Sequence, residues 1–113
     1  MLCFYNMSRR DQQGAVFKAL ADDRRRKILD LLRDGPKTTG ELCEKFKRMN
    51  RCTVMQHLGV LEAADLLIVK RSGRNRWNYL NVAPLQGIYD RWISRYAQPS
   101  VELLARLKRD LEA

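Results

Sequence analysis

One change in the spacing of the apolar residues limits the possible folds of this chain, because elsewhere these residues recur at the period of an α-helix. Apolar side chains recur at helical spacing from residue 14 to 64 and again from 85 to 112. Between these stretches, residues 66–71 and 76–80 are rich in β-formers and flank the turn sequence Ser-Gly-Arg-Asn. The sequence therefore predicts a mainly α fold (α+β) of five to six helices with a two-stranded β-hairpin at residues 66–80.

Length and composition narrow the class of protein. A chain of 113 residues suits one domain spanning 1–113, in which we expect residues 1–13 to form a flexible arm. No apolar run approaches the ~18 residues needed to cross a bilayer, so we expect no membrane association. Three cysteines without paired spacing favour a reducing cytoplasm. One histidine and no glycine-rich phosphate loop leave little material for an enzyme, and we expect no cofactor.

Short-range patterns mark the helix ends. Asp22 is suited to cap the N-terminus of a helix, and Gly35, followed by a proline, is suited to end it. Thr38 and Glu41 have the spacing of a capping box, in which each side chain accepts a hydrogen bond from the other residue's amide. A short helix, a basic turn and a longer helix are therefore expected within residues 38–64.

The longer helix has two different faces. Asn50 can cap it, and Val54, Leu58 and Leu61 recur at i, i+4 and i+7, which predicts a core-facing stripe. The other side carries hydrogen-bonding side chains and almost no acid: Arg51, Thr53, Gln56 and His57.

The positive charge is concentrated in the middle of the chain. The net charge is +9, and residues 24–76 hold 14 basic against six acidic side chains, whereas the flanking segments are nearly neutral. A mixed charge run is usually a solvated face, but an imbalance this localised favours a polyanion-binding surface. A membrane surface also attracts basic residues, but it normally requires an amphipathic helix with exposed aromatic residues beside them.

The predicted elements follow one another in the order of a winged helix-turn-helix. A helix fits the major groove of B-DNA, where each base pair presents a distinct pattern of donors and acceptors. The short preceding helix can present its amide-rich N-terminus to a phosphate, and the hairpin tip can reach the neighbouring backbone or minor groove. This order predicts a module that binds double-stranded DNA.

Residue runs along most of the chain also resemble those of a known family. They are FKALAD (17–22), RRKIL (25–29), GELC (40–43), TVMQHL (53–58), VLE (60–62) and the segment 79–93. Together they are similar to the ArsR/SmtB family of bacterial winged-helix repressors. The resemblance implies a homodimer that represses transcription by binding an operator with dyad symmetry. Where the family usually has glycine after the recognition helix, this chain has Asp65, which tolerates the left-handed conformation.

We expect DNA contacts from two groups of residues. Glutamine suits adenine and arginine suits guanine, so Gln56 and Arg51, with Thr53, are expected at base edges. Lys37, Arg48 and the three wing arginines are expected mainly at backbone phosphates. His57 has an open alternative as a half-buried residue that ties the helix to its neighbours. The recognition helix and preceding turn supply Arg48, Asn50, Arg51, Thr53, Gln56 and His57; the helix start and wing supply Lys37, Thr38, Arg71, Arg74 and Arg76.

The resemblance implies that the first and last helices, at residues 14–20 and 85–112, form the dimer. The last apolar helix is also more than a monomer of this size needs to cover its core. The residues expected at the interface are Phe17, Leu20, Ile88, Trp92, Tyr96, Leu104, Leu107 and Leu111.

Metal sensing is not expected in this chain. Metal-binding members of the family carry a cysteine pair at the start of the third helix, or Asp and His ligands on the last helices. Here the former positions are Thr38 and its neighbours, and residues 85–113 contain no histidine or cysteine.

Cys43 is expected to pack in the interior. Cys52 lies at a helix N-terminus among basic residues, so it is the candidate residue for a redox switch.

Two other functions stay open at the level of sequence. The same fold can serve as a thiol- or ligand-responsive sensor, whose inducer the sequence does not identify, or as a protein-interaction module without DNA binding. Trp77, Trp92 and Tyr96 are expected as core and dimer aromatics, with a ligand box as the alternative.

Overall fold

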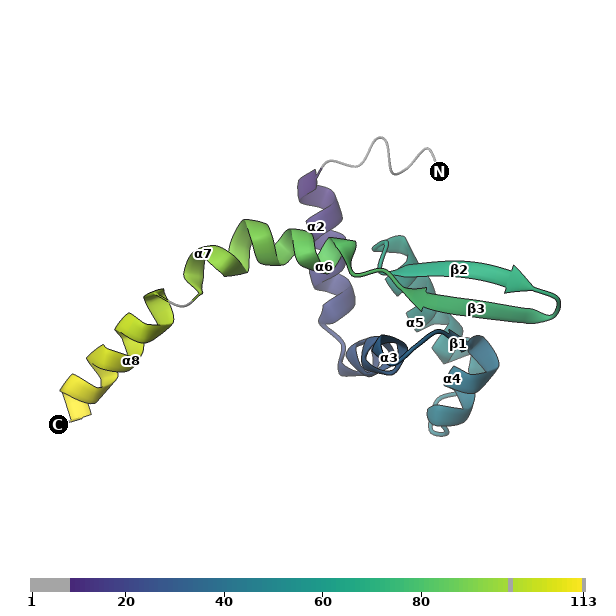
Figure 1. Ribbon diagram of the computed structural model, residues 1–113. Helices are drawn as coiled ribbons and strands as arrows, with labels where there is room; N and C mark the ends of the chain where they lie inside the picture. The colour runs from purple at the N-terminus through teal and green to yellow at the C-terminus, as the bar shows by residue number, and fades with distance from the viewer. Residues whose placement is uncertain (1–8, 98, 113) are drawn as a thin grey trace.

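The computed structural model describes residues 9–97 and 99–112 (Figure 1). Its elements in chain order are α2 (Arg9–Leu20), α3 (Asp23–Arg33), β1 (Lys37–Thr38), α4 (Thr39–Lys45), α5 (Arg51–Ala63), β2 (Leu67–Ser72), β3 (Asn75–Leu80), α6 (Ala83–Ile88), the π-helical turn η1 (Tyr89–Ile93), α7 (Ser94–Tyr96) and α8 (Pro99–Glu112). The order of a winged helix-turn-helix is confirmed, with α4 and α5 as the helix-turn-helix and the β2–β3 hairpin as the wing.

The three predicted helix caps are present. Asp22 Oδ1 accepts a hydrogen bond from an amide in the first turn of α3 at 2.8 Å, and Asn50 Oδ1 does the same for α5 at 2.8 Å. At the start of α4, the amide of Glu41 donates to Thr38 Oγ1 at 3.1 Å, and the amide of Thr38 donates to the Glu41 carboxylate at 3.2 Å. Because such a cap stabilises a helix by about 1 kcal/mol, local sequence fixes where these helices start.

The sheet has three strands rather than the predicted two. Its order is β1-β3-β2, all antiparallel, and β1 pairs Lys37 with Asn78. A strand of two residues has no period of its own, so only its pairing with β3 defines it. Buried Asn78 strengthens this edge, since its Nδ2 donates to the Lys37 carbonyl and to Thr39 Oγ1, both at 3.2 Å. The wing turns at Gly73, whose φ of 61° suits the first position of a tight hairpin turn.

One hydrophobic core joins the helices to the sheet. The recognition helix contributes the predicted stripe of Val54, Leu58 and Leu61, all fully buried. In α2 the inward residues are Val16 and Ala19, so the exposed Phe17 lies on a different face from the core. The remaining core residues are Ile28, Leu29, Leu32, Leu42, Ala64, Leu66, Leu67 and Ile88.

The first described helix starts earlier than the sequence predicts. It begins at Arg9, so residues 9–13, expected within a flexible arm, are helical, and residues 1–8 of that arm lie outside the described residues. Gln12 and Gln13 are half-buried where α2 meets α6 and η1. The start at residue 14 was predicted from the apolar pattern, which these polar residues precede.

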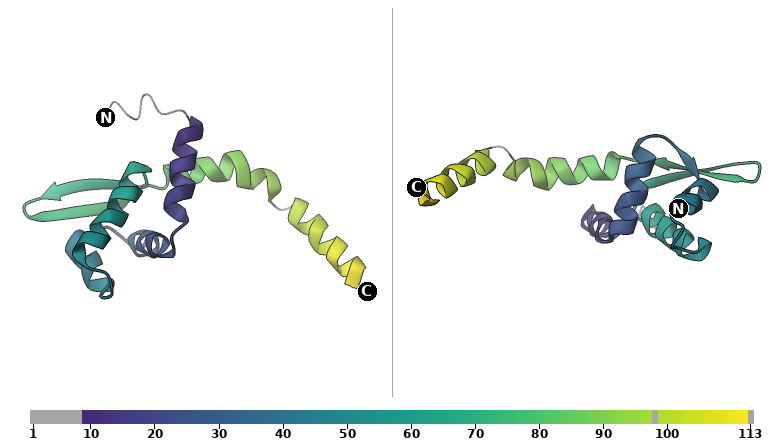
Figure 2. Two further views of the ribbon diagram at one scale, coloured as in Figure 1. Left: turned by 180° about the vertical axis from the view of Figure 1, so that it is seen from behind. Right: turned by 90° about the horizontal axis from the view of Figure 1, so that it is seen from below.

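The C-terminal helices extend away from the winged domain. The segments α6, η1 and α7 follow one another as one helical run beside α2, and α8 then projects outward (Figures 1 and 2). Every side chain from residue 101 to 112 is exposed. The radius of gyration is 17.9 Å, whereas a compact chain of this length has about 13 Å. The projecting helix therefore has no packing partner within its own described chain.

Candidate nucleic-acid interface

The recognition helix α5 presents a polar face opposite its buried stripe. Gln56 is exposed on this face, whereas Arg51 is exposed at the first residue of the helix, in phase with the buried stripe; neither side chain has a hydrogen bond or ion pair with another described residue. Gly59, one turn further along, is also exposed and has open space where a Cβ would lie. The exposed surface of α5 can approach another surface closely and still offer two side chains with free hydrogen-bonding groups.

Asn50 and Thr53 are already engaged with each other. Asn50 Oδ1 accepts from both the amide and the hydroxyl of Thr53, the latter at 3.0 Å. Their main role in the structure is therefore to begin α5, although Thr53 keeps acceptor capacity on its half-exposed hydroxyl. Arg51 and Gln56 carry the stronger case for base contacts.

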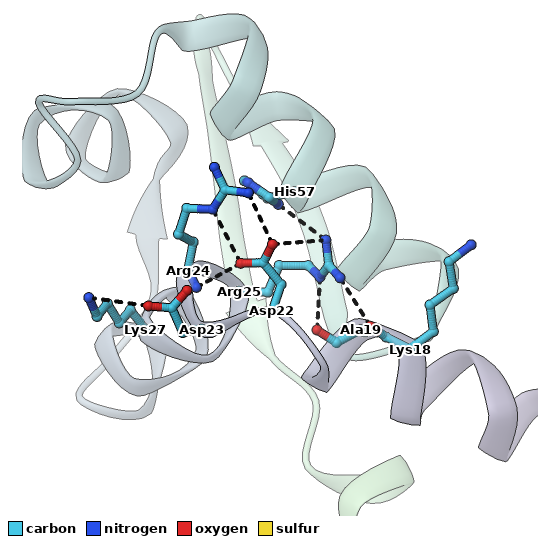
Figure 3. Close-up of polar contacts among 8 residues, drawn as sticks. All are labelled: Lys18, Ala19, Asp22, Asp23, Arg24, Arg25, Lys27 and His57. Atoms are coloured by element: carbon cyan, nitrogen blue, oxygen red, sulfur yellow. Dashed lines mark hydrogen bonds and ion pairs between the residues drawn. The ribbon is translucent and has the colours of Figure 1, made fainter.

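His57 does not fit its predicted DNA contact. Its side chain is only 6% exposed and lies toward α2 and α3, where Arg25 Nη1 is 3.3 Å from His57 Nδ1 (Figure 3). The alternative of a buried histidine that ties the recognition helix to its neighbours is the one that the geometry favours. Burial, the charge of Arg24 and the charge of Arg25 all lower the pKa of His57, while Asp22 opposes them.

The wing arginines differ in the structure although they are close in sequence. Arg71 and Arg74 are exposed and have no ion pair with another described residue. Arg76 instead donates to Glu62 of α5 at 2.7 Å, and only 19% of its side chain is exposed. Its predicted phosphate contact is therefore corrected: Arg76 fastens the wing to the recognition helix.

The start of α4 offers Lys37 and Thr38. Both are half-buried, and the Thr38 hydroxyl oxygen already caps α4. Lys37 has no ion pair with another described residue, so its ammonium group is available to a phosphate.

A basic pocket of about 420 Å³ extends the positive surface beyond the predicted residues. It lies between the start of α3 and the turn joining α4 to α5, and is lined by Arg24, Lys27, Lys45, Phe46, Lys47, Arg48 and Met49. Arg24 and Lys27 pair with Asp22 and Asp23, but Lys47 and Arg48 have no ion pair with another described residue. Of these residues only Arg48 was predicted to contact DNA, because tertiary packing alone brings the start of α3 beside this turn.

Most residues predicted at the dimer interface form exposed apolar surface. Phe17 is 48% exposed and meets Trp92 edge-on with ring centroids 6.5 Å apart; Trp92 in turn lies 5.4 Å from Tyr96. On α8, Leu104, Leu107 and Leu111 are all more than half exposed. Two predicted residues differ: Ile88 is 4% exposed and belongs to the core, and Leu20 is half-buried against it.

No metal centre is evident among the described residues. No group of three or more His, Cys, Asp or Glu side chains there is arranged to hold a metal ion. Cys43 is half-buried against the core, as predicted for a packing residue, and Cys52 is exposed at the start of α5. None of the described helices is long and apolar enough to span a membrane.

Comparisons with known proteins agree with this geometry. The family model described as "Helix-turn-helix domain" matches residues 20–70, which run from the end of α2 into β2. The transcriptional repressor SdpR of Bacillus subtilis is 39% identical over 71 residues, covering 63% of this chain and 78% of the repressor. An ArsR-like transcriptional regulator from Rhodococcus sp. RHA1 has a similar structure, with a TM-score of 0.66 and 26% identity over 87% of this chain and 91% of that one.

The chain belongs to the ArsR family of winged helix-turn-helix transcriptional regulators. This confirms the family that the sequence resembles, and it is a family of regulators rather than of enzymes. A further structural neighbour of this ArsR-family chain is the homodimeric winged helix-turn-helix DNA-binding domain of a Mycobacterium bovis protein. Its TM-score is 0.60, with 27% identity over 78% of this chain and 87% of that one.

Proposed function

We propose that this ArsR-family regulator is a homodimeric repressor that places α5 of each protomer in the major groove of a palindromic operator. The observation that carries the proposal is the exposed polar surface of α5, where the side chains of Arg51 and Gln56 have no partner among the described residues. The basic excess of the chain lies within residues 24–76, which include α5, and the related SdpR bears the name of a repressor. Such a regulator acts in the cytoplasm, where bacterial DNA lies.

Base recognition is assigned to the exposed face of α5. Gln56 suits the N6 and N7 atoms of adenine, and Arg51 suits the O6 and N7 atoms of guanine. Thr53, whose hydroxyl proton is donated to Asn50, can accept a single hydrogen bond beside them. These side chains lie within two turns of the helix N-terminus, the end that recognition helices present to base edges.

Phosphate contacts are assigned around α5. Arg71 and Arg74 extend from the wing, Lys37 lies at the start of α4, and Lys47 and Arg48 lie in the turn before α5. These cations hold the protein in register on the duplex without specifying its sequence. The long wing hairpin, visible in Figure 2, places its turn far from the core and within reach of the backbone beside the groove.

Dimerisation is assigned to the exposed apolar residues of α2, η1, α7 and α8. Exposed apolar patches of this extent mark interaction sites, and the neighbour from Mycobacterium bovis is homodimeric. A two-fold dimer presents two copies of α5 to grooves about 34 Å apart, which implies an operator with two half-sites.

A thiol-responsive variant of this function rests on Cys52, which is exposed on the recognition helix beside Arg51. Alkylation of the purified protein distinguishes a thiol-responsive repressor from one that does not respond to thiol chemistry. A thiol sensor loses DNA affinity after alkylation, whereas the Cys52→Ser variant does not respond.

Selection from a randomised duplex library by the purified chain tests the proposed function. We expect enriched duplexes to share an inverted repeat whose half-sites are centred about one helical turn, or a multiple of it, apart. Enrichment of duplexes with no shared sequence would contradict specific recognition, and a single asymmetric motif would contradict binding as a two-fold dimer.

A further inference from the structure

The side chain of Arg25 joins two other helices to its own (Figure 3). Arg25 belongs to the first turn of α3, but its Nε donates to the Ala19 carbonyl at 2.8 Å and its Nη2 donates to the Lys18 carbonyl at 3.0 Å. These carbonyls lie in the last turn of α2, where backbone oxygens have no partner within the helix. Only 14% of the Arg25 side chain is exposed, so it lies between the helices.

The remaining nitrogen of the same guanidinium, Nη1, contacts the recognition helix. Arg25 Nη1 lies 3.3 Å from His57 Nδ1, and because a guanidinium only donates, the histidine nitrogen accepts. The proton of neutral His57 is then on Nε2, which is buried and has no hydrogen-bond partner among the described residues. Among the described residues, the His57 ring is therefore held by one polar contact, which it makes through Nδ1.

Asp22 anchors the arrangement. Its Oδ2 lies 4.0 Å from Arg25 Nη1 and 3.1 Å from Arg24 Nη2, while its Oδ1 caps α3. One carboxylate therefore fixes the start of α3 and faces the guanidinium that bridges α2 and α5. The contacts run without a gap from the end of α2, through Arg25, to the middle of α5.

We propose that Arg25 is a positioning residue that sets the orientation of the recognition helix relative to α2, and thereby the spacing of the two recognition helices in the dimer. This inference rests on the proposed function, in which α2 lies at the dimer interface and α5 in the major groove. Arg25 contacts neither DNA nor the partner in this arrangement. The orientation that Arg25 sets matters when both half-sites are bound at once. The affinity gained from the second half-site is lost if the spacing of the two recognition helices does not allow both to bind together.

The chain offers a conservative variant and a matched control. Arg25→Lys keeps the positive charge, but a single ammonium cannot reproduce a planar fork directed at two helices. Arg26→Lys is the control, because Arg26 also donates from α3 to the end of α2, at the Leu20 carbonyl, and has no hydrogen bond with a described residue of α5. A second pair acts from the other side: His57→Asn keeps an acceptor near the position of Nδ1, whereas His57→Leu removes it.

The test compares a palindromic duplex obtained by selection with the same duplex after one half-site is scrambled. We expect Arg25→Lys and His57→Leu to weaken binding to the palindrome by about tenfold, within the usual range of coupling between sites. Their binding to the half-scrambled duplex and their dimerisation by analytical ultracentrifugation should stay as in the wild type. Arg26→Lys and His57→Asn should match the wild type on both duplexes.

Two results would overturn the positioning role. One is wild-type affinity of Arg25→Lys and His57→Leu for the palindrome; the other is an equal loss on both duplexes, which indicates a contribution to folding alone. Failure of the proposed function is seen separately, as a wild-type protein that binds the two duplexes alike.

Discussion

At the scale of single residues, the structure separates side chains that are available for binding from those that already have a partner. Arg74 and Arg76 are two positions apart and equally basic, yet only Arg76 is bonded to Glu62, fourteen residues away in the chain. Sequence alone assigned both to DNA, because the partner of a charged side chain depends on tertiary contacts. The same limit applies to His57, whose helical position permitted either face.

The first prediction concerns Gln56. Its replacement by alanine removes a side chain that is exposed on α5 and has no partner among the described residues, so folding should not change. Affinity for the selected operator should fall by about 1–3 kcal/mol, while affinity for random DNA stays the same. Fluorescence anisotropy with the two duplexes measures both quantities. An equal loss on the two duplexes would remove Gln56 from base recognition.

The second prediction uses the two wing arginines as a matched pair. Arg74→Ala should weaken binding to every sequence alike and reduce the slope of log K against log salt by about one, because one phosphate contact is lost. Arg76→Ala should leave that slope closer to the wild-type value and instead lower the melting temperature, because its guanidinium is bonded to Glu62. A salt slope unchanged by Arg74→Ala would show that Arg74 of the wing does not contact a phosphate.

The third prediction is a pH dependence of stability that comes from His57. Burial, Arg24 and Arg25 hold the pKa of His57 below its ordinary value of 6.5, with Asp22 opposing them, so the folded chain binds fewer protons than the unfolded chain. The stabilisation is complete above pH 6.5 and is lost as the pH falls toward the lower folded-state pKa. The pKa of Asp22 lies well below its usual range, so its own contribution falls only at more acidic pH.

Thermal unfolding between pH 8 and pH 5.5 measures this dependence. The wild type should lose stability over the range, and His57→Asn, which carries no titrating group at that position, should lose less. Parallel curves for the two proteins would show that His57 does not titrate differently in the folded state.

At the scale of helices and strands, the features predicted correctly from the sequence are those that depend on interactions between residues close together in the chain. The caps at Asp22, Thr38 and Asn50 are in place, and Asp65 has the left-handed φ of 61° expected after the recognition helix. The strand β1 was missed because two residues show no period, and the early start of α2 was missed because residues 9–13 are polar and precede the apolar pattern. The π-helical turn η1 interrupts the regular spacing and has no signature in the apolar pattern.

The fourth prediction concerns α8. Its side chains from residue 101 are exposed, including the apolar Leu104, Leu107 and Leu111. Removal of residues 99–113 should therefore leave the winged domain folded but impair dimerisation, since the helix packs on nothing in its own described chain. Light scattering gives the oligomeric state, and circular dichroism checks the fold. An intact dimer after the deletion would refute this role of α8.

At the scale of the whole molecule, charge and shape divide the chain into two parts. The basic excess lies mainly on α3 and the wing, on either side of the helix-turn-helix in sequence, and the exposed apolar surface lies on α2 and the C-terminal helices. The charge division was predictable from residue order alone. The extended shape was not, because nothing in an apolar helical pattern tells whether it packs on its own core or on a second copy.

The central claim is that this chain recognises a DNA sequence rather than binding polyanions in general. Binding of the wild type to the selected operator and to a scrambled duplex of the same composition, measured across a salt series, tests it most directly. We predict tighter binding to the operator that persists at physiological salt, with a steep loss on the scrambled duplex. Equal affinity for both duplexes, falling together with salt, would contradict it.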